Sequence, residues 1–342
     1  MDSIYKMFRT LICIALLSAS VSATIYDKFH TWAETHKIAV PDSDHEFLHL
    51  FTNWKNNDKI IEETNTKNLS YTLGHNAFSG MSSTEFAEHM NFEFNRELLL
   101  PTQSFVQSSF KSVSAPVSVD WRTKNAVTPV KDQGQCGSCW SFSTTGAVEG
   151  IYAIKRGNLV SFSEQQLVDC DYIRVGGTSL GCNGGDMGSA MDWIGKNNGL
   201  CTEQAYPYVS GETKTNGACQ KTCSIVSGSD ISTTASVSPN SDNAMMTALA
   251  QQPVSVAIEA DQSSFQLYKS GVFSGSCGTN LDHGVLLVGY GTMTAGDYYI
   301  LKNSWASSWG DQGYMYLGRG SQYNGGKGQC GVLMQGVYPV LI

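Results

Sequence analysis

The sequence has no long apolar run after its first twenty residues, no block of Lys or Arg, and no cysteine between residues 24 and 135. A membrane-spanning helix needs roughly 20 apolar residues in a row, so we expect no membrane span. A net charge of −8 without a basic block is not typical of a nucleic-acid-binding protein. Hydrophobic residues make up 41% of the chain and aromatic residues 11%, which is enough for a buried core.

The N-terminus has the pattern of a secretory signal peptide. Lys6 and Arg9 precede the short apolar stretch Leu11–Leu17, and small residues follow as far as Ala23. This order of basic, apolar and small residues predicts cleavage after Ala23. The apolar stretch is too short for a membrane anchor.

The cysteine count then becomes informative, because disulfides form in the oxidising compartments of the secretory pathway. The chain has ten cysteines, at positions 13, 136, 139, 170, 182, 201, 219, 223, 277 and 330. Cys13 leaves with the signal peptide, and an odd number remains. Four disulfides and one free thiol are therefore expected.

The rest of the chain divides into two segments of different composition. The first, residues 24–114, opens with apolar residues at helical spacing and ends in a linker rich in Ser, Thr and Gln, where a protease could cut. The second, residues 115–342, holds all the remaining cysteines. Its residues 139–156 predict one long helix, and the apolar runs 253–258, 285–288 and 298–301 predict strands. This order indicates an α+β protein with two unequal lobes.

The turn Gln133–Phe142 contains Cys136 and Cys139 two residues apart, and four interpretations compete for it. A thioredoxin-like redox pair should follow a strand, and none is evident here. A zinc site needs a second ligand pair, and no pair of histidines accompanies the other cysteines. Two structural disulfides would conflict with the odd number of cysteines. The fourth interpretation makes one cysteine structural and the other a nucleophile.

Cys139 is the better placed of the two for nucleophilic chemistry. At the start of the predicted helix it would meet unpaired N–H groups and the positive end of the helix dipole, which favour a thiolate. Such a nucleophile needs a base, and the base needs a group to orient it. His283, at the mouth of an apolar strand, and Asn303, just after the next strand, are the candidates.

These motifs together resemble the papain-like cysteine proteases, the cathepsin L-like branch in particular. The resemblance rests on the following strings and continues nearly to the C-terminus: 133–140 (QGQCGSCW), 163–170 (SEQQLVDC), 181–185 (GCNGG), 253–256 (PVSV), 282–283 (DH), 288–291 (VGYG), 303–305 (NSW) and 338–339 (YP). The string at 136–140 matches the pattern that is typical of papain and the cathepsins around their reactive cysteine.

The resemblance implies a two-lobed fold, with a helical left lobe, a β-barrel-like right lobe and a cleft between them, preceded by a helical prodomain. It implies that Cys139 attacks as a thiolate paired with protonated His283, and that Asn303 orients the imidazole under the cover of Trp305. Gln133 would donate its side-chain N–H to the oxyanion. We expect an endopeptidase that acts through an acyl-enzyme intermediate.

The same resemblance supplies a set of substrate-binding residues. Those expected to contact the peptide backbone, the leaving-group side or the pocket for the second residue before the cut are Gly184, Gly185, Met187, Ala257, Leu281, Asp282, Gly284, Trp309 and Gln335. The pocket walls are mostly apolar, so we expect a preference for Leu, Val or Phe. Asp282 should contact substrate through its backbone, because neighbouring side chains in a strand point to opposite faces.

The resemblance also pairs most of the cysteines. It implies the disulfides Cys136–Cys182, Cys170–Cys219 and Cys277–Cys330. Cys201 and Cys223 have no counterparts in the basic family pattern, and parity suggests a fourth bridge between them, with exchange of partners between Cys219 and Cys223 left open. Cys139 would then be the free thiol.

Residues 24–114 resemble the inhibitory propeptide of the family, through the helical pattern around Asn57 and the string 74–78 (GHNAF). Three positions depart from it: Leu50 stands where Arg is usual, Trp54 where Phe is usual, and Gly80 where Asp is common. The missing Arg and Asp put the usual salt-bridge network and its pH trigger in doubt. Asn68 begins an N-glycosylation sequon.

We therefore expect a signal peptide over 1–23, an inhibitory propeptide over 24–114 and a mature peptidase domain over 115–342. No cofactor or metal is expected. Expected partners are protein and peptide substrates, the chain's own propeptide and cystatin-like inhibitors, and we expect a monomer delivered to a lysosome or vacuole or exported. Two alternatives remain: a secreted thiol–disulfide oxidoreductase and a catalytically silent papain-like binding protein.

Overall fold

The computed structural model describes residues 25–90, 106–107 and 115–341. The predicted signal peptide and most of the linker lie outside the described residues. No helix of the described residues is long and apolar enough to cross a membrane.

The chain forms helices in its first segment and a mixture of helices and strands afterwards. Residues 25–35 are helical. The labelled helices are α2 Asp44–Asn65, α3 Ser83–Met90, α4 Cys139–Arg156, α5 Glu164–Cys170, α6 Met187–Lys196, α7 Ser210–Thr213, α8 Asp242–Leu249 and α9 Ser263–Gln266. The strands are β1 Tyr71–Leu73, β2 Val106–Gln107, β3 Val119–Asp120, β4 Ile231–Ser236, β5 Val254–Ile258, β6 Tyr268–Phe273, β7 His283–Met293, β8 Gly296–Lys302, β9 Tyr314–Gly318 and β10 Gly336–Leu341. The predicted helix over 139–156 is confirmed as α4, and the three predicted strands lie in β5, β7 and β8.

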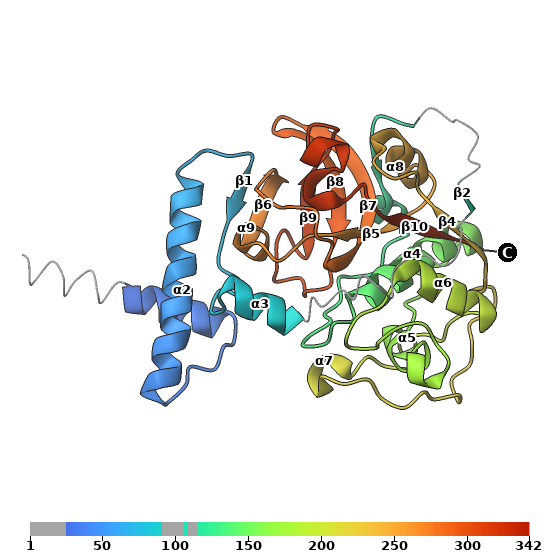
Figure 1. The fold of residues 1–342 in the computed structure, drawn as a ribbon, viewed down its shortest axis with the longest axis horizontal. Helices are drawn as coiled ribbons and strands as arrows, with labels where there is room; N and C mark the ends of the chain where they lie inside the picture. The colour runs from blue at the N-terminus through green and yellow to red at the C-terminus, as the bar shows by residue number, and fades with distance from the viewer. Residues whose placement is uncertain (1–24, 91–105, 108–114, 342) are drawn as a thin grey trace, which may run out of the picture.

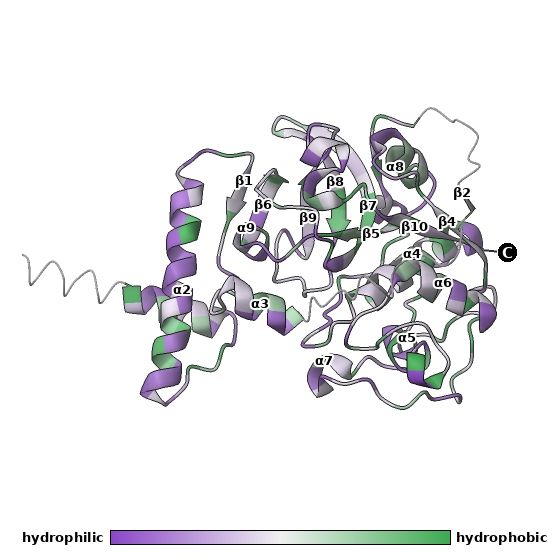
Figure 2. Cartoon of the chain, in the orientation of Figure 1, coloured by the Kyte–Doolittle hydropathy of each residue, from purple (hydrophilic) through white to green (hydrophobic). Residues whose placement is uncertain are grey.

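One large sheet forms the centre of the molecule. Its strand order is β1-β6-β9-β8-β7-β5-β10-β4-β2, and β3 pairs with β7 beside this path. Figure 1 shows the first segment in blue at one end, the C-terminal strands in orange and red, and helices α4 to α7 in green and yellow on the other side. Hydrophobic residues follow the central strands, whereas much of α2 is hydrophilic (Figure 2).

The core explains why the helical and sheet parts stay together. One cluster of buried side chains combines α4 and α6 with residues of β5, β7 and β10, including Val148, Met191, Ala257, Leu286 and Val337. Helix α4 is buried along most of its length, which matches its apolar sequence. The helical and sheet lobes therefore share a packed interface, and the first residues of α4 and β7 lie at it.

The first segment has its own aromatic core and adds a strand to the sheet. Phe29, Trp32, Phe51 and Trp54 form a buried cluster between the helix over 25–35 and α2. Strand β1 pairs antiparallel with β6, so the first segment is hydrogen-bonded to the second. This strand was not predicted from the sequence, because it has three residues and its partner is about 200 residues away.

Candidate active site

The four predicted catalytic side chains come together at the interface between the lobes. Cys139 is the first residue of α4, and its Sγ accepts a hydrogen bond of 3.4 Å from the backbone N–H of Gly284. His283 is the first residue of β7, so it adjoins that glycine in the chain. Nε2 of His283 lies 2.8 Å from Oδ1 of Asn303, which directly follows β8. A pair of adjacent strands therefore positions the imidazole and its orienting amide.

An indole ring covers the contact between the histidine and the asparagine. Trp305 stacks on the ring of His283, with the ring centroids 4.6 Å apart and the planes inclined by 25°. His283 is fully buried and Asn303 nearly so. Oδ1 of Asn303 also accepts a hydrogen bond of 2.8 Å from the N–H of Ser304, which fixes the direction in which the amide points.

Gln133 is held at both ends of its side-chain amide. Its Nε2 donates to the backbone oxygen of Cys136 at 3.1 Å, and its Oε1 accepts from Oγ of Ser304 at 2.7 Å. Ser304 was not among the residues predicted from the sequence. Its position directly after Asn303 was the available signal, but its partner lies about 170 residues earlier in the chain.

Burial favours the uncharged forms of Cys139 and His283. Burial raises the pKa of the Cys139 thiol to about 11, although the N–H groups of Gly284 and Trp140 work against that shift. Burial lowers the pKa of His283 to about 4, partly offset by the hydrogen bond to Asn303. A neutral thiol and a neutral imidazole are therefore the favoured forms of these buried groups.

Residues of the first segment pack against Trp305, the ring that stacks on His283. Phe86 of α3 meets Trp305 edge-on at 5.2 Å, and Phe78 does so at 6.0 Å. The amide of Gln266 donates to the backbone oxygens of Phe78 and Met81. Trp305, which stacks on His283, thus also binds the first segment, and Gln266 is a second contributor to this binding that was not predicted from the sequence.

The predicted pocket residues are also brought together. Gly284 pairs with Ala257 across β5 and β7, and a Cβ atom on Gly284 would lie 3.2 Å from Sδ of Met187. Leu281 packs on the same cluster. The backbone oxygen of Gln335 accepts a hydrogen bond from the N–H of Ala257. The side-chain Nε2 of Gln335 donates to Asp186 at 2.9 Å.

The other predicted substrate-binding residues are held by close packing, backbone conformation or hydrogen bonds; they are Gly184, Gly185, Asp282 and Trp309. Gly185 packs so closely on Trp140 that a Cβ atom would lie 2.5 Å from the indole, and Gly184 has a positive φ of 109°. Trp309 is fully buried and donates to the backbone oxygen of Gln266. The carboxylate of Asp282 accepts from the N–H of Ala260 at 2.8 Å, so that hydrogen bond runs to the chain beyond β5.

Four disulfides are present, and Cys139 is the free cysteine among the described residues. The bridges are Cys136–Cys182, Cys170–Cys219, Cys201–Cys223 and Cys277–Cys330. This pairing is the one that the resemblance and the parity argument indicated. Since Cys136 is bridged to Cys182, the two cysteines of the turn have different chemical states.

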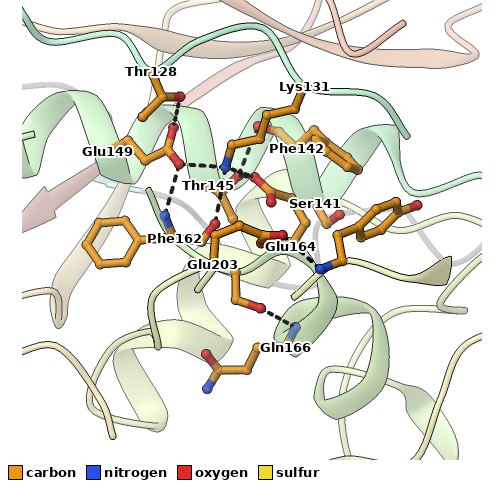
Figure 3. Close-up of polar contacts among 12 residues, drawn as sticks. Thr128, Lys131, Ser141, Phe142, Thr145, Glu149, Phe162, Glu164, Gln166 and Glu203 are labelled. Atoms are coloured by element: carbon orange, nitrogen blue, oxygen red, sulfur yellow. Dashed lines mark hydrogen bonds and ion pairs between the residues drawn. The ribbon is translucent and has the colours of Figure 1, made fainter. Parts of the chain in front are cut away.

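Figure 3 shows a buried charge cluster around Lys131, Glu149 and Glu164. Nζ of Lys131 contacts Oε1 of Glu149 at 2.8 Å and Oε1 of Glu164 at 2.6 Å. Thr128 donates to Glu149 at 2.6 Å and accepts from Lys302 at 2.9 Å. Lys302 precedes Asn303 on the sheet side, whereas Glu149 belongs to α4, so the cluster joins the two lobes.

Comparison with known proteins agrees with this geometry. Residues 115–340 match the papain family of cysteine proteases, and residues 29–86 match the cathepsin propeptide inhibitor domain. The chain belongs to the papain family of cysteine proteases. It is an endopeptidase of that family, made as a zymogen with a propeptide, and the first segment described above is its inhibitory domain.

Individual relatives cover both parts of the chain. The KDEL-tailed cysteine endopeptidase CEP2 of Arabidopsis thaliana is 42% identical over 93% of this chain and 86% of its own length. The probable cysteine protease RD21B of the same plant is 45% identical over 85% of this chain, which spans only 60% of that relative. The proform of the ragweed pollen allergen Amb a 11 superposes with a TM-score of 0.82, at 36% identity over 92% of this chain and 94% of that structure.

Proposed function

We propose that this zymogen becomes an endopeptidase that cleaves peptide bonds through Cys139 and His283 once residues 24–114 are removed. The observation that carries the proposal is the arrangement of these side chains. Cys139 begins α4, Gly284 contacts its sulfur, and His283 is held through Nε2 by Asn303. Because Nε2 is directed at Asn303, we assign the exchange of a proton with the thiol to Nδ1.

The chemistry follows from these roles. When the propeptide leaves, water reaches the cleft and the cost of charging the thiol and the imidazole falls. The proton then moves from Cys139 to His283, and the thiolate attacks the peptide carbonyl. Gln133 and the N–H of Cys139 stabilise the oxyanion. His283 gives its proton to the leaving amine, a thioester remains, and water activated by His283 hydrolyses it.

The substrate preference follows from the pocket around Met187 and Ala257. Its walls are apolar, and Gln335 is tied to Asp186, so no uncompensated charge faces an apolar side chain. We propose that Leu, Val or Phe is preferred at the second position before the cut. Fluorogenic peptides that differ only at this position test the preference, and a higher kcat/KM for Arg than for Leu would contradict it.

The route and the partners remain part of the proposal. The signal-like residues 1–23 and the sequon at Asn68 support passage through the secretory pathway, to a lysosome or vacuole or to the outside. Asn68 is exposed shortly after the end of α2, with a φ of 48°, where a glycan could be carried. We also propose that the mature enzyme is a monomer and that cystatin-like proteins inhibit it.

The deciding experiment is acid treatment of the precursor with an epoxide inhibitor of cysteine proteases and a fluorogenic peptide. We expect thiol-dependent cleavage that is abolished by the inhibitor, with the label on Cys139. The Cys139→Ala variant is the matched control. Absence of both labelling and cleavage would overturn the proposal. Activity that depends on a Cys136 thiol would instead support an oxidoreductase.

A further inference from the structure

The three parts of the propeptide meet at one buried carboxylate. Asp58 lies in α2 and is 5% exposed. Its two oxygens accept from Nζ of Lys28 at 2.9 and 3.0 Å, and Oδ1 also lies 3.0 Å from Nε2 of His75. Lys28 belongs to the helix over 25–35, and His75 to the segment that follows β1. The carboxylate therefore joins all three parts.

An apolar contact occupies the place where the family pattern has a charged pair. A Cβ atom on Gly80 would lie 2.4 Å from Cδ1 of Leu50 and 2.9 Å from the indole of Trp32. The leucine thus fills the space that the glycine leaves open. Acid cannot act on this contact, because neither residue titrates.

His75 is held in its neutral form by its surroundings. Its ring stacks on Trp54, with centroids 4.9 Å apart and planes inclined by 11°. When Nε2 donates to Asp58, a second proton must go to Nδ1, which is buried and has no hydrogen-bond partner among the described residues. A buried N–H without an acceptor costs about 1–3 kcal/mol.

The charges around the ring do not reverse this preference. Asp58 and Glu62 of α2 act on the His75 ring from one side. Lys28 of the helix over 25–35 and His36, which directly follows that helix, act on it from the other part of the propeptide. Burial lowers the pKa of His75 below its ordinary value of 6.5 by more than the hydrogen bond to Asp58 raises it, and Lys28 adds to the lowering.

Water can reach this region from outside. A solvent-open hollow of about 460 Å³ is lined by Lys28, Trp32, His36, Trp54 and His75, among others. Protons therefore have access to the cluster without prior unfolding of the propeptide.

The residue next to His75 attaches the propeptide to the peptidase domain. Nδ2 of Asn76 donates to the backbone oxygen of Gln266 at 2.7 Å, and its own backbone oxygen accepts from Nε1 of Trp32 at 2.8 Å. Phe78, two residues later, packs against Trp305 over the catalytic histidine. A displacement of His75 is thereby passed to the contacts that cover the active site.

We propose that His75 is the acid-sensitive latch of this zymogen, closed over Asp58 while neutral and opened when it is protonated. This inference rests on the proposed role of residues 24–114 as a removable inhibitor. A histidine whose pKa is lowered in the folded state stabilises that state above pH 6.5, and the stabilisation is lost as the pH falls through the lowered value. The propeptide should therefore loosen in mildly acidic solution.

The first test needs no proteolysis. In the Cys139→Ala zymogen, thermal unfolding and tryptophan fluorescence are followed from pH 8 to pH 4. His75→Gln keeps an N–H for Asp58 but cannot take a proton in this range. We expect it to lower the pH midpoint of propeptide loosening by about 0.5–1 unit. His30→Gln, an exposed histidine on the first helix, should leave the midpoint unchanged.

The second test measures propeptide removal in the active zymogen at each pH. We expect His75→Gln to need a lower pH for the same rate of processing, whereas the mature enzyme keeps its wild-type kcat/KM. His75→Phe, which preserves the ring on Trp54, provides a second non-titrating variant. An unchanged midpoint in a folded variant overturns the latch. Failure of both variants to fold at pH 7.5 also overturns the latch. The proposal requires only an uncharged side chain at position 75 at this pH, and both variants have one.

These two tests separate the latch from the proposed function. If the zymogen never releases its propeptide or cleaves peptide, the proposed function fails, yet the unfolding experiment still reports on His75. If processing occurs normally but the His75 variants follow the wild-type pH dependence, only the latch fails.

Discussion

The hydroxyl of Ser304 donates a hydrogen bond of 2.7 Å to Oε1 of Gln133 and so fixes which way the side-chain amide of Gln133 faces. Gln133 comes from the loop before α4, and Ser304 from the loop after β8, so this bond crosses between the lobes. It links the proposed oxyanion donor to the same backbone segment that carries Asn303.

Ser304→Ala should therefore weaken oxyanion stabilisation without removing it. A neutral hydrogen bond contributes about 1 kcal/mol, which corresponds to a roughly fivefold fall in kcat with little change in KM. Gln133→Ala, the matched control, should cost about 10²–10³ in kcat. Steady-state kinetics of the double variant should match Gln133→Ala alone, and a further fivefold loss would show that Ser304 acts elsewhere.

The cysteines give a prediction that is independent of activity. Alkylation of the denatured, unreduced zymogen should label Cys139 alone, because the other described cysteines are paired. Mass mapping of the label checks this, and reduction before alkylation serves as the control by exposing every cysteine. A second labelled position in the unreduced sample would contradict the four disulfides.

Glu203 lies beside Glu164 of the buried charge cluster and predicts a loss of stability at neutral pH. Burial and the charge of Glu164 raise the pKa of Glu203 to about 7. Because this value lies above the ordinary 4.5, the stabilisation from Glu203 is complete below pH 4.5 and is lost as the pH rises through 7. The Tm of the mature enzyme should fall by a few degrees between pH 5 and pH 8.

Glu203→Gln should flatten this part of the profile, since a glutamine cannot lose a proton. Glu212→Gln, an exposed glutamate on α7, is the matched control and should keep the wild-type profile. Scanning calorimetry at several pH values provides the measurement. A Glu203→Gln profile that falls as steeply as the wild type would exclude this carboxyl as the cause.

The contact between Leu50 and Gly80 predicts strong coupling between the two positions. Gly80→Asp alone should destabilise the propeptide, because even its Cβ atom would collide with Leu50. Leu50→Arg alone should lose apolar packing. The double variant should recover part of the loss, with a coupling energy of about 0.5–3 kcal/mol in a double-mutant cycle. Thermal unfolding of the Cys139→Ala zymogen measures each corner of the cycle, and simple additivity would refute the coupling.

Those parts of the molecule that depend on local pattern could be predicted from the sequence. Helix α4 was predicted to its boundaries, because residues 139–156 lack proline and keep an apolar spacing throughout. Cys139, His283 and Asn303 were found because each carries a distinctive neighbourhood in the chain. The partnership of Ser304 with Gln133 and of Asp58 with His75 depends on contacts between distant segments, which periodicity does not reveal. The fit of Leu50 over Gly80 is a matter of shape, so the sequence showed only that two usual residues were missing.

The disulfides described above have a mechanical consequence. Three of them lie within residues 136–223 on the helical side, and Cys277–Cys330 lies on the sheet side, so none of the four joins the two sides of the cleft. The two lobes are held together by packing, by hydrogen bonds such as that of Ser304 to Gln133, and by the buried charge cluster. A reducing agent that keeps Cys139 as a thiol therefore breaks no disulfide between the two lobes.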